Sequence, residues 1–222
     1  AGGTFGIDVV DGLEVGSAVA IGDGSGDGVA DQYVTAPGAA AGASSMFAFE
    51  GGPGGPRTPP VINDGAADLG RRGYGSAIAV GDVDRDGAVE VVSGNAGGFP
   101  DGADTLVDAG RFTLGWFDAS SVFVGLFLDA DQDTAGVFGA AEVGDEFGGA
   151  VLVRDLNDDG HADVVVAAPG EGVRGDAEAG MVLLIPGSDE GIDLTADRPV
   201  HQRTTGVGGV KEAGDRFGQA LG

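Results

Sequence analysis

Oxygen-bearing side chains recur at fixed spacing in three nine-residue stretches of the chain. These stretches span residues 23–31, 82–90 and 155–163, and each has Asp, Glu, Asn or Ser at positions 1, 3, 5 and 9 and glycine at position 6. Calcium prefers about six to eight oxygen ligands from a tightly curled loop, and alternate residues supply them. The glycine permits a sharp turn at which a Cβ would clash. The spacing therefore predicts three calcium-binding loops.

The predicted ligands are the side chains at positions 1, 3, 5 and 9 and the main-chain carbonyl at position 7. They are Asp23, Ser25, Asp27, Val29 and Asp31 in the first loop, Asp82, Asp84, Asp86, Ala88 and Glu90 in the second, and Asp155, Asn157, Asp159, His161 and Asp163 in the third. The first site is expected to be the weakest because its serine is neutral. Magnesium fits less well, since it requires stricter octahedral geometry and keeps its waters. The ring of His161 is expected to face solvent. The alternative, solvated Asp/Gly turns, is disfavoured because the spacing repeats.

The residues around each loop indicate strands rather than helices. An EF-hand loop lies between helices and ends with Glu at position 12, whereas this position is Val34, Ser93 and Val166 here. Short apolar runs precede and follow each loop, as at 150–153 and 164–168. Such runs are typical of buried strands. We therefore expect each loop to join two antiparallel strands.

A glycine stands seven residues before the first aspartate of each loop. These glycines are Gly16, Gly75 and Gly148, preceded by Val15, Tyr74 and Phe147, and a partial fourth copy begins at Gly214 and contains Phe217-Gly218. The glycines at 16, 75, 148 and 218 are 59, 73 and 70 residues apart. Such intervals suit four-stranded propeller blades. A repeat of strands and helices is disfavoured because helix-length patterns between the strands are lacking.

The repeated unit resembles the FG-GAP repeat. Phe-Gly, then Asp-x-Asn-x-Asp-Gly-x-x-Asp, then an apolar strand ending in Ala-Pro occupies residues 147–169, with a good match at 74–94 and a looser one at 15–37. FG-GAP repeats form the β-propeller of integrin α subunits and of many microbial surface proteins. The resemblance implies an all-β fold, namely a β-propeller segment of four-stranded antiparallel blades with calcium loops between the first and second strands.

The repeat divides the chain into five expected segments. They are the end of a preceding blade (1–14), blades at 15–73, 74–146 and 147–213, and the first strand of a further blade (214–222). Propellers usually need about four to eight blades to remove their open edges. We therefore expect a piece of a longer propeller. Further copies assembling into a ring, in which residues 4–10 and 217–222 pair to close a blade, are the alternatives.

Two features outside the loops could bind a metal or a ligand, namely residues 129–133 and Trp116. Residues 129–133 resemble half of another metal loop, but position 6 is Thr134 and position 9 is Val137, so we expect a solvated acidic turn. Trp116 lies in a predicted strand at 111–117 and is expected to pack between blades rather than to form a sugar-stacking platform. Other strands are predicted at 45–50, 61–62, 122–128, 179–185 and near 199–205.

The composition is strongly acidic. The net charge is −25, with 36 acidic residues and a single lysine, Lys211. Such a surface repels nucleic acid and anionic membranes. The Debye length falls from about 10 Å at 0.1 M salt to about 3 Å at 1 M, so the protein should prefer salt. This composition resembles that of halophilic proteins, and an acidic surface protein from a high-GC bacterium is the alternative. There is no cysteine and no 18-residue apolar run, so neither disulfides nor a membrane span is expected.

The sequence favours binding over catalysis. It has no cysteine nucleophile, and His161 and His201 lack partner motifs, so no enzyme is expected. Arg174-Gly175-Asp176 spells the tripeptide that integrins recognise, which we attribute to chance in an Asp/Gly-rich chain. The leading hypothesis is a calcium-binding propeller module of a secreted or cell-surface protein, with an unknown protein or glycan partner, in adhesion or protein interaction. The alternatives are a self-assembling surface component and the propeller part of a secreted hydrolase.

Overall fold

The described residues are built from strands and loops. The structure, a computed structural model, describes residues 14–37, 45–57, 61–63, 75–97, 106–117 and 123–222. Within these ranges the one helical element is a single 3-10 turn, Leu194–Ala196. The expected strand at 4–10 and Tyr74 lie outside the described residues. The all-β prediction is confirmed.

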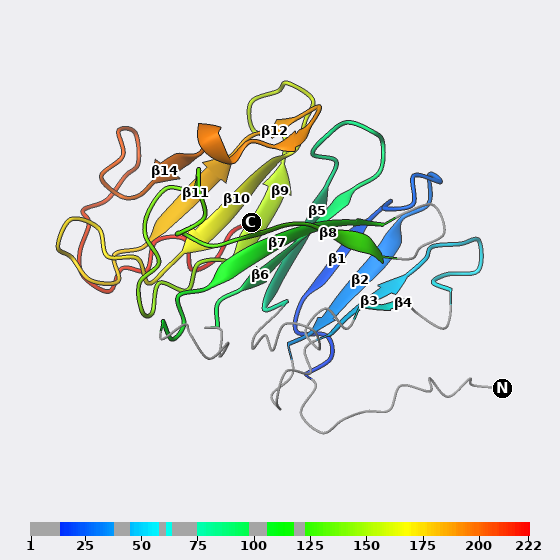
Figure 1. Ribbon diagram of the computed structural model, residues 1–222, viewed down its shortest axis with the longest axis horizontal. Helices are drawn as coiled ribbons and strands as arrows, with labels where there is room; N and C mark the ends of the chain where they lie inside the picture. The colour runs from blue at the N-terminus through cyan, green and yellow to red at the C-terminus, as the bar shows by residue number, and fades with distance from the viewer. Residues whose placement is uncertain (1–13, 38–44, 58–60, 64–74, 98–105, 118–122) are drawn as a thin grey trace.

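Twelve strands form three four-stranded antiparallel sheets in which the strands are ordered as in the chain (Figure 1). Unit 1 contains β1 (Val19–Gly22), β2 (Asp31–Ala36), β3 (Ser45–Phe49) and β4 (Val61–Asn63); unit 2 contains β5 (Ala77–Gly81), β6 (Glu90–Asn95), β7 (Arg111–Phe117) and β8 (Phe123–Ala130); unit 3 contains β9 (Val151–Arg154), β10 (Asp163–Ala168), β11 (Met181–Ile185) and β14 (Arg198–Val200). A small hairpin, β12 (Gly187–Ser188) and β13 (Gly191–Ile192), follows β11. Each acidic loop joins the first and second strands of its sheet, as predicted.

The first strands of the three units lie side by side (Figure 1). Glycines at the ends of β1 and β5 permit this approach. A Cβ on Gly22 would lie 2.8 Å from a methyl group of Val89, and one on Gly81 would lie 2.4 Å from a methyl group of Val153. The acidic loops, which follow these strands, are therefore brought together at one end of the sheets.

The core lies in the seams between neighbouring sheets. In the first seam, Tyr33 and Met46 of unit 1 pack against Ile78, Val80 and Val91 of unit 2. The second seam is larger and joins Val92, Phe112 and Leu114 of unit 2 to Phe147, Val151, Val164, Val166 and Leu183 of unit 3. Each sheet thus buries apolar side chains on its faces and leaves its connecting loops at the surface.

The Phe-Gly pair fastens one unit to the next. Phe147 is fully buried, and its ring meets that of Phe112 edge to face with centroids 5.9 Å apart. Its N–H donates to the carbonyl of Ala109 at 2.9 Å. Gly148 has φ +85°, and a Cβ there would lie 2.1 Å from the Arg111 carbonyl oxygen, so only glycine fits. The same N–H bond joins Phe217 to Ala179 at 3.0 Å, so the second Phe-Gly pair contacts unit 3 as the first contacts unit 2.

A longer repeat, which the sequence analysis missed, precedes each Phe-Gly pair. Residues 131–150 and 201–220 share Gln, Thr, Gly, Glu and Asp at matching positions. In both copies the threonine hydroxyl accepts the N–H three residues earlier, at 3.0 Å, and the aspartate accepts the N–H of the glutamate. Residues 214–220 correspond to the turn before β9, and the structure has no strand within 214–222, where we expected the first strand of a further unit.

The prediction of a solvated acidic turn at 129–133 is confirmed only for its end, where residues 132–133 form a turn and Asp133 is exposed. Strand β8 continues to Ala130, which is buried, and Gln132 is buried beneath Gly139. The carboxylate of Asp129 lies 3.0 Å from the guanidinium of Arg111 on the neighbouring strand. The first half of the segment therefore belongs to the fourth strand of unit 2. Trp116 lines a pocket at the second seam and is only half-buried, so the described residues do not enclose its ring between two units as we expected.

We predict that Phe147→Ala lowers the free energy of unfolding by about 3–5 kcal/mol, because it leaves a cavity and removes the contact with Phe112. Urea denaturation followed by circular dichroism measures the change. Phe138→Ala is the matched control, since Phe138 is exposed and its loss should cost less than about 0.5 kcal/mol. Equal effects of the two substitutions would contradict the role given to the second seam.

Candidate metal-binding site

The three acidic loops share one backbone conformation. In each loop the aspartate at position 1 accepts the glycine N–H at position 6, with distances of 2.7 Å for Asp23, 3.1 Å for Asp82 and 2.9 Å for Asp155. The aspartate at position 5 accepts the N–H at position 7 at 2.8–2.9 Å. Positions 4 and 6 have positive φ in every loop, for example 62° at Arg85 and 94° at Gly87. The side chains therefore hold the loops curled.

Position 1 leaves a buried oxygen without a partner in two loops. Asp82 Oδ1 and Asp155 Oδ1 are buried and accept no hydrogen bond from the described residues. A buried carboxylate oxygen without a partner is costly, because it has lost its water. A cation would compensate this cost. The residues present thus fit a hard metal ion on a ground independent of their spacing.

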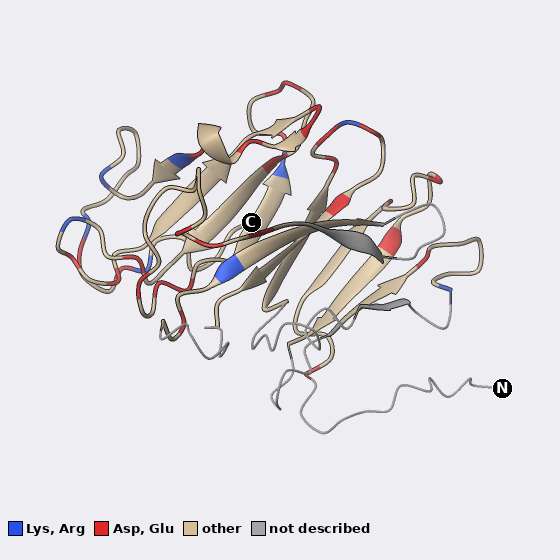
Figure 2. Ribbon diagram, in the orientation of Figure 1, with Lys and Arg blue, Asp and Glu red and all other residues tan. Residues whose placement is uncertain are grey.

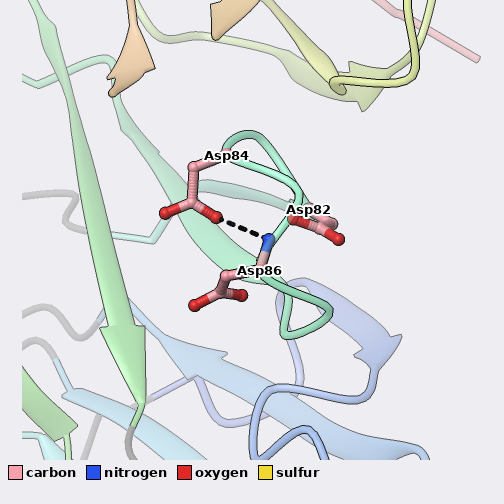
Figure 3. A group of neighbouring side chains, drawn as sticks. All are labelled: Asp82, Asp84 and Asp86. Carbon is pink, nitrogen blue, oxygen red and sulfur yellow. Dashed lines mark hydrogen bonds between the residues drawn. The ribbon is translucent and has the colours of Figure 1, made fainter. Parts of the chain in front are cut away.

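The second loop brings three carboxylates together. One oxygen each of Asp82, Asp84 and Asp86 lies within 4.8 Å of the others. Figure 3 shows Asp84 accepting the N–H of Asp86, at 3.1 Å, within this group. Burial raises the pKa of Asp84, and repulsion from Asp86 and Asp82 adds to the shift. Three like charges at this distance repel one another, and a divalent cation would turn that repulsion into attraction.

The other two loops bring some of their predicted ligands into direct contact. The Ser25 hydroxyl lies 3.3 Å from Asp23 Oδ1 in the first loop. In the third, Asn157 Nδ2 lies 2.8 Å from Asp159 Oδ2, and Asn157 Oδ1 accepts the Asp159 N–H. These pairs place positions 1 and 3, or 3 and 5, on the same side of the curled backbone.

The carboxylates at position 9 have a structural role that the spacing alone did not indicate. Asp31, Glu90 and Asp163 are buried, and each accepts the N–H at position 2 of its own loop, at 2.8–3.0 Å. Asp31 and Asp163 also accept the N–H groups of Gly51 and Gly187, which tie each loop to the segment after the third strand. An ionised carboxylate offers about four acceptor sites, so these residues retain lone pairs for a metal.

Glu90 is the most perturbed of these groups. Burial raises its pKa to about 7, and repulsion from Asp84, Asp86 and Asp82 adds to the shift, while the Val83 N–H opposes it. In the first unit, burial and the nearby Asp31 and Asp23 charges raise the pKa of Tyr33, which packs under the loop.

Backbone hydrogen bonds link the loops in series. The N–H at position 8 of each later loop donates to the carbonyl at position 1 of the loop before it. Val89 thus bonds to Asp23 at 2.9 Å, and Ala162 bonds to Asp82 at 2.9 Å. Arg85 also reaches the carbonyl of Asp159 at 3.4 Å. The order of one loop therefore supports that of the next.

The prediction that the ring of His161 faces solvent is wrong. Its side chain is only 12% exposed, and its two nitrogens lie 2.9 Å from Asp189 Oδ1 and 3.3 Å from Asp159 Oδ1. The hydrogen bond to Asp189 raises the pKa of His161. Asp189 belongs to the turn between β12 and β13, so the ring connects this hairpin to the third loop.

Another acidic group lies in the second seam, away from the loops. Asp145 is only 2% exposed and accepts the N–H of Glu142 at 2.7 Å. Burial raises its pKa to about 7, and the charges of Glu171 and Glu142 add to the shift. Burial likewise raises the pKa of Glu171, which accepts a hydrogen bond from Gln132 at 2.7 Å. One buried carboxyl group, Asp145, and one half-buried carboxyl group, Glu171, thus lie near the junction of units 2 and 3.

The Arg174-Gly175-Asp176 tripeptide forms a tight hairpin turn. Val173 and Asp176 exchange two backbone hydrogen bonds, and Arg174 and Gly175 between them have φ of 51° and 92°. The Asp176 carboxylate lies 2.6 Å from the ammonium group of Lys211, which also bonds to the Val173 carbonyl. The aspartate is therefore already paired.

No helix in the described ranges has the length and apolar character needed to cross a membrane.

The comparisons with known proteins agree with this architecture. Residues 147–185 match the FG-GAP repeat family model. Integrin alpha pat-2 of Caenorhabditis elegans is 33% identical over 148 residues, which is 63% of this chain and 11% of that protein. Phosphatidylinositol-glycan-specific phospholipase D is 42% identical in Homo sapiens and 40% in Rattus norvegicus, each over 77 residues, 33% of this chain and 9% of the enzyme. The chain thus spans about a tenth of the length of these relatives, and the FG-GAP resemblance is confirmed.

The buried Asp145 generates a pH prediction. Because its pKa is higher in the folded protein than in the unfolded chain, the folded state binds the proton more tightly, so stability falls as pH rises from about 4 to about 7. We predict that Asp145→Asn, which keeps an acceptor for the Glu142 N–H, reduces this fall by on the order of 1–3 kcal/mol.

Urea unfolding at several pH values in constant salt measures the difference. The matched control is Asp215→Asn, because Asp215 accepts the equivalent Glu212 N–H but is exposed. If Asp145→Asn and the parent protein lose stability in parallel between pH 4 and 7, the buried carboxyl group is not the cause.

Proposed function

We propose that this chain, an FG-GAP repeat protein of the integrin-alpha-like kind, is a calcium-stabilised segment of a β-propeller that mediates adhesion or protein interaction in a secreted or cell-surface protein. The observation that carries the proposal is the common geometry of the three loops. Each holds the position 1 aspartate in the same hydrogen bond, and two leave its second oxygen buried and unpaired.

Calcium would bind the side chains at positions 1, 3, 5 and 9 and the carbonyl at position 7 in each loop. The ion would supply positive charge where Asp82, Asp84 and Asp86 repel one another. At calcium concentrations ten times the dissociation constant, each site would add about 1.4 kcal/mol to stability. Three sites are substantial against a typical domain stability of about 5–15 kcal/mol. The hydrogen bonds between loops would pass this ordering from one unit to the next.

An open face on unit 1 supports the assignment to a larger propeller. Val19 and Ile21 are 49% and 66% exposed. Their counterparts in unit 2, Ile78 and Val80, pack against unit 1, and Val151 and Val153 of unit 3 pack against unit 2. A further unit of the same kind, from the same polypeptide or a further copy, would cover this face. We retain the divisions at residues 15, 74, 147 and 214 as the proposed unit boundaries.

The charge distribution supports a salt-rich setting. Figure 2 shows acidic residues mainly in the loops and turns at the ends of the sheets, while the strands carry few charges. The acidic residues of the described ranges thus lie mainly on surfaces that contact solvent, where added salt would screen them. We propose a secreted or surface location, with a halophilic source as the preferred reading of the composition and a nucleic-acid partner disfavoured.

One comparison favours a second candidate function. The similarity to phosphatidylinositol-glycan-specific phospholipase D, 42% over 77 residues, supports a propeller that accompanies a hydrolase. In that case the described residues would support or present a catalytic domain and would not themselves react. A purely structural, self-assembling surface component is the third candidate. Adhesion requires calcium-dependent capture of a partner, assembly requires self-association, and a hydrolase requires turnover.

We predict that millimolar calcium in molar salt raises the melting temperature and that a chelator reverses the rise. Asp155→Asn should remove about a third of the effect, because the buried Oδ1 that would contact the metal loses its charge. Asp158→Asn is the matched control in the same loop, because Asp158 is exposed and occupies position 4, where its φ of 61° also suits asparagine. Differential scanning calorimetry gives the shifts.

A calcium response that is absent, or that Asp158→Asn reduces as much as Asp155→Asn, would refute the metal assignment. The functions are then separated on the calcium-loaded protein. Sedimentation velocity detects self-association, and release of product from a glycosylated phosphatidylinositol detects hydrolysis. A calcium-dependent partner in the absence of both results would support adhesion.

A further inference from the structure

A pocket of about 210 Å³ lies beside the second loop, in the seam between units 2 and 3. One wall consists of loop residues, among them Asp84, Asp86 and Glu90. The opposite wall is apolar and consists of Leu114 and Trp116 from β7. Gly191 of the hairpin β12–β13 closes one side. The pocket therefore combines residues from both units with the predicted ligands of one metal site.

The pocket is larger than a metal ion requires. A single water needs about 10–15 Å³ of such space, so 210 Å³ is far more than an ion or one water fills. Pockets for drug-sized ligands measure about 300–1,000 Å³. The space beyond the ion therefore suits a small ligand of about the size of one sugar ring.

The loop wall of the pocket includes the carboxylate of Glu90. Glu90 is only 6% exposed, and among the described residues the Val83 N–H is the hydrogen-bond partner of its carboxylate, through Oε2. Its other oxygen is left without a partner in a side chain that lines the pocket. The Glu90 side chain is thus mostly buried while this oxygen stays open to the pocket, where it can contact a bound ion.

The two walls of the pocket favour a neutral ligand that has hydroxyl groups and an apolar face. A chain of net charge −25 repels carboxylates and phosphates, so a neutral ligand is favoured. An organic cation would compete with calcium for the same carboxylates. Hydroxyl groups are neutral oxygen donors that can replace the waters of bound calcium. An indole ring offers a flat apolar face to the C–H groups of a pyranose, with Leu114 beside it.

The corresponding pocket of unit 3 lacks one of these walls. It measures about 260 Å³ and contains Asn157 and Asp163 of the third loop, but its opposite wall has Leu184, Pro186 and Arg198 and no aromatic ring. The two pockets thus share the metal loop and differ in the stacking surface. The third loop serves as an internal control for metal binding without sugar binding.

We propose that the pocket beside the second loop binds a pyranose sugar, with vicinal hydroxyls on the metal held by that loop and the ring against Trp116. This inference rests on the proposed calcium binding and gives it a ligand class. Trp116 would contact the ligand, Glu90 and Asp84 would hold the metal that orients it, and Gly191 would leave room for the ring. Unit 3 would thereby take part in a site whose metal belongs to unit 2.

Trp116 is the only tryptophan of the chain, so tryptophan fluorescence comes from this pocket alone. The full chain, loaded with calcium in molar salt, is titrated with methyl α-mannopyranoside, methyl β-galactopyranoside and N-acetylglucosamine while tryptophan emission is recorded. We expect a saturable change with at least one sugar, lost in chelator. It should also be lost in Asp82→Asn, which impairs the second loop, and retained in Asp155→Asn, which impairs the third.

Isothermal titration calorimetry tests the aromatic wall without relying on its fluorescence. Trp116→Ala should abolish the heat of sugar binding and retain the calcium-induced rise in melting temperature. Should Trp116→Ala not fold, Trp116→Phe keeps an apolar ring and should weaken sugar binding at least tenfold without changing the calcium response.

The outcomes separate this proposal from the one on which it rests. A calcium-dependent rise in melting temperature with no sugar response in either assay overturns the sugar site and leaves the metal sites standing. A sugar response that persists in chelator, or in Asp82→Asn, overturns the role of the metal in the pocket. If calcium has no effect on the melting temperature, the proposed calcium binding is refuted, and the sugar site that depends on it is refuted as well.

Discussion

Apolar packing between the faces of neighbouring sheets is the interaction on which the described structure depends. Hydrogen-bonded strand ladders hold each sheet together, but among the described residues no ladder joins one sheet to the next. Isolated backbone hydrogen bonds do link the units, and side chains such as Phe112, Phe147 and Leu183 in the second seam supply most of the buried contact. Burial of each such side chain contributes about 1.5–3 kcal/mol. The close approach of β1, β5 and β9 follows from this packing, and so does the gathering of the acidic loops at one end.

The same arrangement places acidic loops at one end of the seams. The loops follow the first strands, and the first strands touch, so successive loops are neighbours, while carboxylates repel one another within a loop, as in the group of Asp82, Asp84 and Asp86. Side-chain to backbone hydrogen bonds absorb part of this charge, as at Asp31 and Asp163, whose oxygens all accept N–H groups. Asp82 and Asp155 each keep one buried oxygen that accepts no hydrogen bond from the described residues. Cations would lower the electrostatic cost of these unpaired oxygens, either as screening ions in high salt or as calcium in the proposed sites.

The sequence predicted the sheets and the loop positions because both depend on local patterns. Apolar runs on either side of an Asp/Gly turn define a hairpin, and the repeated spacing fixes its register, as β9 and β10 show. Contacts between units were not predictable in this way. The half-loop at 129–133 was read as solvated because its pairing with Arg111 and Glu171 depends on residues about 18 and 39 positions away. The ring of His161 was misplaced for the same reason, since Asp189 lies on another hairpin.

The pairing of Lys211 with Asp176 has a consequence for the chemistry of the molecular surface. Lys211 is the only lysine of the chain, and its side chain is 3% exposed. No side-chain amine is therefore presented to solvent. Acylating reagents, lysine-directed crosslinkers and enzymes that conjugate proteins through lysine would find no accessible side-chain target in the folded state. A burst of amine reactivity at position 211 would instead signal that the turn at 173–176 has opened.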